Sequence, residues 1–116
     1  MSNIDSDTVI LITRYGMGEA PPELQIKLLN TYLTLLDQNN ILPGVICFYT
    51  NGVKAVVEGS PFLDILSLIE SKGTRLILCK TCLDYFGLTE KVKVGIVGGM
   101  TDIIEAQGRG NKVISL

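Results

Sequence analysis

The run Val9-Ile10-Leu11-Ile12 decides the fold, because all four residues are apolar and most of them are β-branched. A strand with one face in water alternates apolar and polar residues, whereas a strand covered on both faces is continuously apolar. Four further short runs have the same character and are predicted to be strands: Val45 to Tyr49, Leu76 to Leu78, Val94 to Val97, and Val113 to Leu116. The pattern favours a mostly parallel, five-stranded sheet between layers of helices.

Helical patterns occupy the segments between these runs. Proline is well tolerated at the first helical positions, and glycine commonly follows the last one. On this basis four helical segments are predicted: from Pro21-Pro22 through Leu36, from Ser60-Pro61 to Gly73, a short turn from Cys82 to Gly87, and from about Thr101 to Gln107. Because strands and helices alternate, we expect a three-layer α/β/α fold with right-handed crossovers.

The composition narrows the class of protein. A chain of 116 residues suits a single domain over residues 1–116. Ten Lys and Arg residues are scattered among twelve acids, so the clustered basic surface of a nucleic-acid-binding protein is not expected. The stretch from Met1 to Asp7 carries acids where a signal peptide needs positive charge. The apolar runs are shorter than the roughly 20 residues of a membrane span. We expect a cytoplasmic protein with no membrane partner.

Apolar residues are abundant for so small a chain. The mean hydropathy is +0.36, although a small domain must leave much of its surface in water. Part of the apolar surplus is therefore expected to be buried between subunits. The sequence predicts a homo-oligomer.

The segment Cys79-Lys80-Thr81-Cys82 is the best candidate for chemistry. It follows the predicted strand at 76–78, and ligands of open α/β sheets gather at the carboxyl ends of strands. The positive end of a following helix lowers the pKa of a thiol, and Lys80 and Thr81 are expected to add a cation and a hydroxyl donor. Cys79 is predicted to be the nucleophile, with Cys82 more sheltered and acting as a resolving thiol.

Other candidate residues carry weaker signals. Cys47 lies inside a predicted strand, where cysteine usually acts as a small apolar residue. At the end of that strand Asn51 is expected to have a structural role, and Lys54 to add positive potential near the thiol. The chain has no histidine, which excludes an imidazole base. A structural zinc site needs four ligands, and two well-placed cysteines do not predict a metal site.

Several stretches together resemble the DsrE/DsrF-like family, in particular the DsrE-type domain at the C-terminal end of YedF-like proteins of sulfur and selenium metabolism. The resemblance rests on Gly16-Met17-Gly18-Glu19 with Glu23-Leu24, on Asn51-Gly52-Val53-Lys54 with Glu58-Gly59-Ser60, and on Cys79 to Leu88. The last stretch is the most specific, since the family typically has C-G-T-C-L-D there. Lys80 departs from the family's glycine, and Gly98-Gly99-Met100 stands where related sequences tend to have Thr-Asn-Met.

This resemblance implies a parallel α/β/α fold, assembly into homo- or hetero-oligomers (often trimers or hexamers), and relay of sulfur as a cysteine persulfide without a cofactor. It implies Cys79 as the working cysteine, and a TusA-like domain on another chain as a possible donor or acceptor. The sequence hypothesis is therefore a sulfurtransferase-like relay in which Cys79 accepts the sulfur and Cys82 helps. Two alternatives stay open: a dithiol–disulfide oxidoreductase using the same pair, and a non-catalytic oligomeric binding protein.

Overall fold

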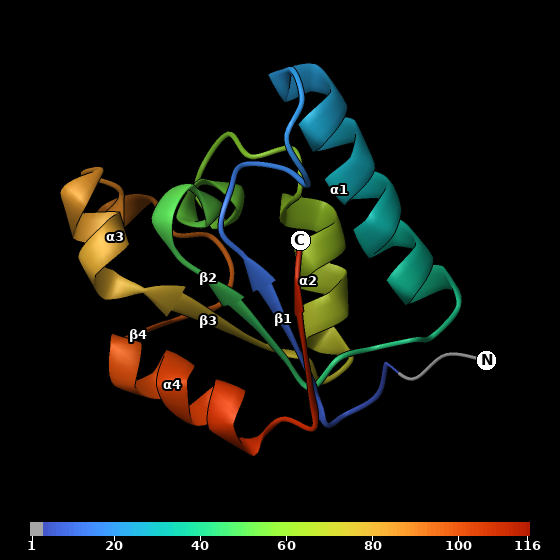
Figure 1. The fold of residues 1–116 in the computed structure, drawn as a ribbon. Coiled ribbons are helices and arrows are strands. Elements are labelled where there is room, and N and C mark those ends of the chain that lie inside the picture. Colours follow the sequence, from blue (N-terminus) through green and yellow to red (C-terminus); the bar gives the residue numbers. More distant parts are fainter. Residues whose placement is uncertain (1–3) are drawn as a thin grey trace.

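The protein contains a five-stranded parallel sheet with helices on both faces (Figure 1). The computed structural model describes residues 4–116, so the start of the acidic N-terminal stretch lies outside the described residues. The strands are β1 (Thr8–Ile12), β2 (Val45–Phe48), β3 (Arg75–Cys79), β4 (Ile96–Gly98) and β5 (Lys112–Ser115). They are ordered β4-β3-β2-β1-β5, and every neighbouring pair is parallel. The predicted fold class is confirmed.

Helices cover the two faces of the sheet unequally. The helices are α1 (Pro22–Gln38), α2 (Leu63–Ser71), α3 (Lys80–Tyr85) and α4 (Met100–Arg109), with short 3-10 helices η1 (Thr50–Val56) and η2 (Thr89–Lys91). Figure 1 shows α1 and α2 on one side of the sheet and α4 on the other, with α3 at the carboxyl end of β3. The second side thus receives less helical cover, among the described residues, than the first.

The interior strands explain why the apolar runs are continuous. All five residues of β1 are buried, and Ile46, Cys47 and Phe48 of β2 are fully buried. Strand β4 lies at the edge of the sheet, where Ile96 is 67% exposed. An apolar run predicts burial on both faces only for a strand that has neighbours on both sides.

Helix α2 begins later than the prolines suggest. The sequence predicts a start at Ser60-Pro61, but the first helical residue is Leu63. The Ser60 hydroxyl accepts a hydrogen bond from the Phe62 amide at 3.0 Å and donates one to the Ala55 carbonyl at 2.6 Å. Ser60 therefore stabilises a turn ahead of the helix, since serine side chains compete for nearby backbone groups.

Two other predicted boundaries are also wrong. Helix α4 continues through Gly108 and ends at Arg109, with Gly110 at its C-cap. Strand β4 begins at Ile96 rather than Val94, because the preceding Gly95 has a positive φ of 85° and turns the chain. Helix α1, in contrast, begins at its proline as predicted.

Helix η1 lies closely against the end of β1. A Cβ atom on Gly52 would collide with the Ile12 carbonyl oxygen, so this approach requires glycine. The Gly52 amide donates to the Tyr49 carbonyl at 2.9 Å. The close approach of Gly52 to Ile12 holds the segment that follows β2 over the carboxyl edge of the sheet, beside α3.

Cys47 is a core residue, and its burial makes the fold sensitive to alkali. Burial raises the pKa of its thiol from 9.0 to about 11, with the Arg75 charge acting in the opposite direction. A folded-state pKa above the unfolded one means that the contribution to stability is intact below pH 9 and is lost as the pH rises towards 11. Across this pH range we expect the free energy of unfolding of the wild type to fall by about 2–3 kcal/mol more than that of the Cys47→Val variant. Urea denaturation of both proteins at pH 8 and pH 11 measures the difference, and parallel losses would contradict it.

Candidate active site

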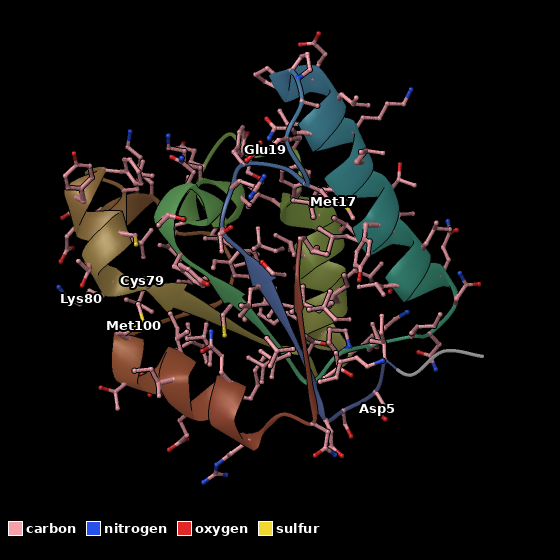
Figure 2. The ribbon with its side chains drawn as sticks, viewed as in Figure 1. Asp5, Met17, Glu19, Cys79, Lys80 and Met100 are labelled. Atoms are coloured by element: carbon pink, nitrogen blue, oxygen red, sulfur yellow. The ribbon has the colours of Figure 1, made fainter. Side chains whose placement is uncertain are left out.

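The cysteine pair lies where β3 passes directly into α3. Cys79 is the last residue of β3 and the N-cap of α3, and Cys82 lies in the first turn. Figure 2 shows Cys79, Lys80 and Met100 at the same end of the molecule, where α3 and α4 begin. The predicted position of the pair at the carboxyl edge of the sheet is thus the observed one, although the Cys79 side chain makes no capping hydrogen bond to α3.

The relative exposure of the two thiols is the reverse of the sequence expectation. Cys79 is 2% exposed, whereas Cys82 is half-buried. Side chains alternate along a strand, so Cys79 points to the same face as Ile77, whose side chain lies against Gly98, the last residue of β4. The prediction of an exposed Cys79 and a sheltered Cys82 is wrong, because the strand directs the first side chain into the protein.

Cys82 opens onto a hollow at the surface. The hollow has a volume of about 280 Å³ and is largely apolar, and it is lined by Thr50, Asn51, Thr81, Cys82, Tyr85 and Phe86. Tyr85 is 84% exposed. A reagent or a partner's side chain can therefore approach the Cys82 sulfur from solvent, and an apolar wall borders its path.

Burial and two neighbouring groups, Cys79 and the Thr50 backbone, act on the pKa of the Cys82 thiol. Burial raises the pKa of the Cys82 thiol above its ordinary value, and the hydrogen bond between Cys82 and Cys79 raises it as well. The Thr50 backbone N–H donates a hydrogen bond to Cys82 Sγ at 3.0 Å and lowers the same pKa. A negative charge on Cys79 opposes ionisation of Cys82. Thr50 is thus the donor that favours the Cys82 thiolate.

Lys80 does not direct its charge at the thiols. Its ammonium nitrogen lies 2.7 Å from Asp84 Oδ2, four residues along the exposed side of α3. The hydrogen bonds from Lys80 and from the Thr89 hydroxyl lower the pKa of Asp84. The expected activation of the thiol by Lys80 is wrong for this arrangement, because the Lys80 ammonium group is paired with Asp84.

The remaining predicted residues lie on either side of Phe86. Asn51 and Thr81 line the hollow with Cys82, but within residues 4–116 the Thr81 hydroxyl has no hydrogen bond to either sulfur. Lys54 Nζ lies 4.5 Å from the centre of the Phe86 ring and lines a second hollow of about 490 Å³. Tyr15 and Glu58 line that second hollow too, so Phe86 separates two adjoining depressions.

Sequence reasoning missed Thr50, Tyr85 and Phe86 as components of the site. The two aromatic residues could have been found from their spacing after Cys82, since residues three and four positions apart share one face of a helix. Thr50 could not have been found in this way, because its contact depends on the unpredicted helix η1.

Between residues 4 and 116 there is no group of three or more His, Cys, Asp or Glu side chains arranged to hold a metal ion. The same part of the chain has no helix whose length and apolar character would let it cross a membrane.

Comparisons with known proteins identify the family. The solved structures that resemble this chain include the YchN protein of E. coli, with a TM-score of 0.70, 19% identity, and 94% of this chain and 97% of that chain covered. MTH1491 of Methanobacterium thermoautotrophicum, a protein of unknown function, has a TM-score of 0.69 at 19% identity, with coverage of 94% and 97%. BT1422 of Bacteroides thetaiotaomicron, also of unknown function, has a TM-score of 0.67 at 15% identity, with both chains fully covered.

These likenesses show a shared fold. No curated protein matches the chain. The family model of the DsrE/DsrF-like family matches residues 12–116, which include every strand after the first and both cysteines of the pair. The chain therefore belongs to the DsrE/DsrF-like family.

Proposed function

We propose that the protein is a sulfur-relay protein that carries sulfane sulfur as a persulfide on the Cys79–Cys82 pair. Membership of the DsrE/DsrF-like family suggests a role related to sulfur relay. The observation that carries the proposal is the arrangement of the two thiols: Cys82 lines a surface hollow and is hydrogen-bonded to the sheltered Cys79. One thiol can thus meet a donor while the other stores the cargo away from solvent.

The first step takes place at Cys82. Its thiolate attacks the outer sulfur of a donor persulfide R–S–SH, the S–S bond of the donor breaks, and the donor leaves as the thiolate R–S⁻. The product is Cys82–S–SH, and no electrons are gained from or lost to any other species. The reverse reaction with an acceptor thiolate delivers the sulfur.

Cys79 then acts on the loaded Cys82. Attack of the Cys79 thiolate on the outer sulfur moves the sulfur to Cys79 and restores the Cys82 thiolate. Attack on the inner sulfur instead forms a Cys79–Cys82 disulfide and releases HS⁻. The sequence hypothesis gave Cys79 the role of first acceptor; the exposures favour Cys82 for that role and Cys79 as the second site.

Mass spectrometry tests the proposal directly. After incubation with a low-molecular-weight persulfide, the wild type is expected to gain the mass of one sulfur atom, and the Cys79→Ser/Cys82→Ser double variant to gain none. Cys47→Val, which removes the buried thiol, is the matched control and is expected to load like the wild type. Loading of the double variant would overturn the proposal.

The same thiol contact also favours a second candidate, a dithiol–disulfide oxidoreductase. The two thiols interact and belong to a Cys-x-x-Cys segment at the start of a helix, the spacing that thioredoxin-like oxidoreductases use. The reduction potential of the pair distinguishes the two functions: an oxidoreductase needs a potential near that of the cellular thiol pool, whereas a relay does not.

The partners of a relay are proteins that present or accept a reactive sulfur. We propose a donor or acceptor thiol carried by another chain, such as a TusA-like domain, that docks against the hollow beside Tyr85 and Phe86. We also propose that the protein acts as a homo-oligomer in the cytoplasm. The apolar composition and the exposed apolar residues of β4 and α4 support the assembly.

A further inference from the structure

Thr50 has a backbone conformation that its residue type does not favour. Its φ is +49°, and Asn40 is the other non-glycine residue between 4 and 116 with a positive φ. Asparagine is enriched in this left-handed region, but a β-branched residue there is a genuine outlier. Such conformations persist where the surroundings hold them, and they cluster at functional sites.

Two backbone carbonyl groups lie within hydrogen-bond distance of the Thr50 hydroxyl and hold it in place. Its hydroxyl oxygen lies 2.5 Å from the Thr13 carbonyl oxygen and 2.7 Å from the Tyr49 carbonyl oxygen. A hydroxyl has one proton to donate, and Thr13, at the end of β1, is the nearer acceptor. The side chain therefore ties the end of β2 to the end of β1 at the carboxyl edge of the sheet.

This tie determines where the Thr50 backbone N–H points. Tyr49 is extended, with a φ of −147° and a ψ of 172°, and the positive φ of Thr50 turns the chain at once into η1. The peptide between the two residues faces α3, and its N–H donates to Cys82 Sγ at 3.0 Å. Because this donor belongs to the backbone, no side-chain rotation has to be restricted for it to bind the sulfur. The Thr50 N–H is therefore in position before a donor's sulfur reaches Cys82.

We propose that Thr50 is a positioning residue: its hydroxyl, anchored on Thr13, holds the 49–50 peptide so that the backbone N–H stabilises negative charge on the Cys82 sulfur. This inference depends on the proposed function in one respect only, which is the reaction that the Cys82 thiolate performs. The same N–H stabilises the negative charge that forms again on the Cys82 sulfur when the transferred sulfur moves to Cys79 or to an acceptor.

No other described group takes over this task. Lys80 is engaged with Asp84 on the outer side of α3, and Lys54 lies over the far hollow against Phe86. Cys79, the other group in contact with the Cys82 sulfur, disfavours its ionisation. The Thr50 amide is thus the contact that favours the thiolate.

The test is the pH dependence of alkylation at Cys82, followed with iodoacetamide and peptide mass mapping. Thr50→Val has nearly the same shape but lacks the hydroxyl, so the turn relaxes and the N–H leaves the sulfur. A hydrogen bond to a charged group is strong enough that its loss should lower the thiolate fraction at neutral pH about tenfold or more. Thr50→Ser keeps the hydroxyl and is expected to retain the wild-type profile.

Circular dichroism and the thermal midpoint of each variant verify that the fold is intact. A folded Thr50→Val protein with the wild-type alkylation profile would overturn the proposal, as would a Thr50→Ser protein that behaves like Thr50→Val. Alkylation requires no persulfide, so the result stands apart from the loading experiment. If the wild type does not load sulfur but Thr50→Val still shifts the profile, the relay fails and the positioning role survives.

Discussion

Replacing Cys82 by serine is expected to abolish sulfane-sulfur loading, and replacing Cys79 is expected to leave it largely intact. In Cys82→Ser the remaining thiol of the pair is Cys79, which is 2% exposed. A donor can reach it only after local opening of the structure, and an opening that costs about 3 kcal/mol slows the reaction more than a hundredfold. Intact-protein mass spectrometry at short incubation times measures both variants.

The Cys79→Ser variant adds a second readout. Its Cys82 loses the neighbouring thiol whose negative charge raises the Cys82 pKa, so its initial loading rate at neutral pH should be at least that of the wild type. Its persulfide has no second site to move to, and should be lost faster to a small thiol such as dithiothreitol. Equal initial loading of Cys82→Ser and the wild type would return the role of first acceptor to Cys79.

The fold could be predicted because its determinants are local. Continuous apolar runs such as Val9 to Ile12 can be stable only in strands covered on both faces, and the intervening helical patterns supply the cover. The errors fall where a side chain or a turn competes with the regular pattern. Ser60 bonds to the backbone ahead of α2, and Gly95 turns the chain before β4.

The site could be predicted in place but not in orientation. A cysteine pair after a strand indicates the carboxyl edge of the sheet, and Cys79 and Cys82 do lie there. The exposure of each thiol depends on its surroundings in the folded chain: β3 directs Cys79 into the protein, and η1, about thirty residues earlier in the sequence, contacts Cys82. The ion pair of Lys80 with Asp84, in contrast, follows from their i,i+4 spacing. Sequence reasoning could have found it, and it would have removed Lys80 from the list of thiol activators.

The β4–α4 patch, defined as Ile96, Val97, Met100 and Ile104, is the feature that bears on assembly. All four side chains are exposed, Ile96 to 67% and Ile104 to 62%. The patch combines the outer edge of the sheet with the face that α4 covers. It also borders the sulfur site, since Gly98 of β4 pairs with Cys79 of β3. Large exposed apolar patches mark interaction sites.

A second apolar surface lies on the opposite side of the sheet. Leu24, Leu28 and Leu35 of α1 are each exposed to between 44% and 49%. These positions repeat at helical spacing, but the stripe includes no unpaired strand edge. The two surfaces therefore offer a matched comparison for locating the contact between copies of the chain.

The double variant Ile96→Lys/Ile104→Lys is expected to be monomeric at concentrations where the wild type is an oligomer. Burial of an isoleucine side chain contributes about 1.5–3 kcal/mol, so the loss of two from each subunit weakens association more than a hundredfold. Lysine adds the cost of removing a charge from water at the same position.

Leu28→Lys on α1 is the control and should keep the wild-type mass in multi-angle light scattering. A wild type that is monomeric at micromolar concentration would refute the assembly, and dissociation by Leu28→Lys alone would place the interface on α1 instead.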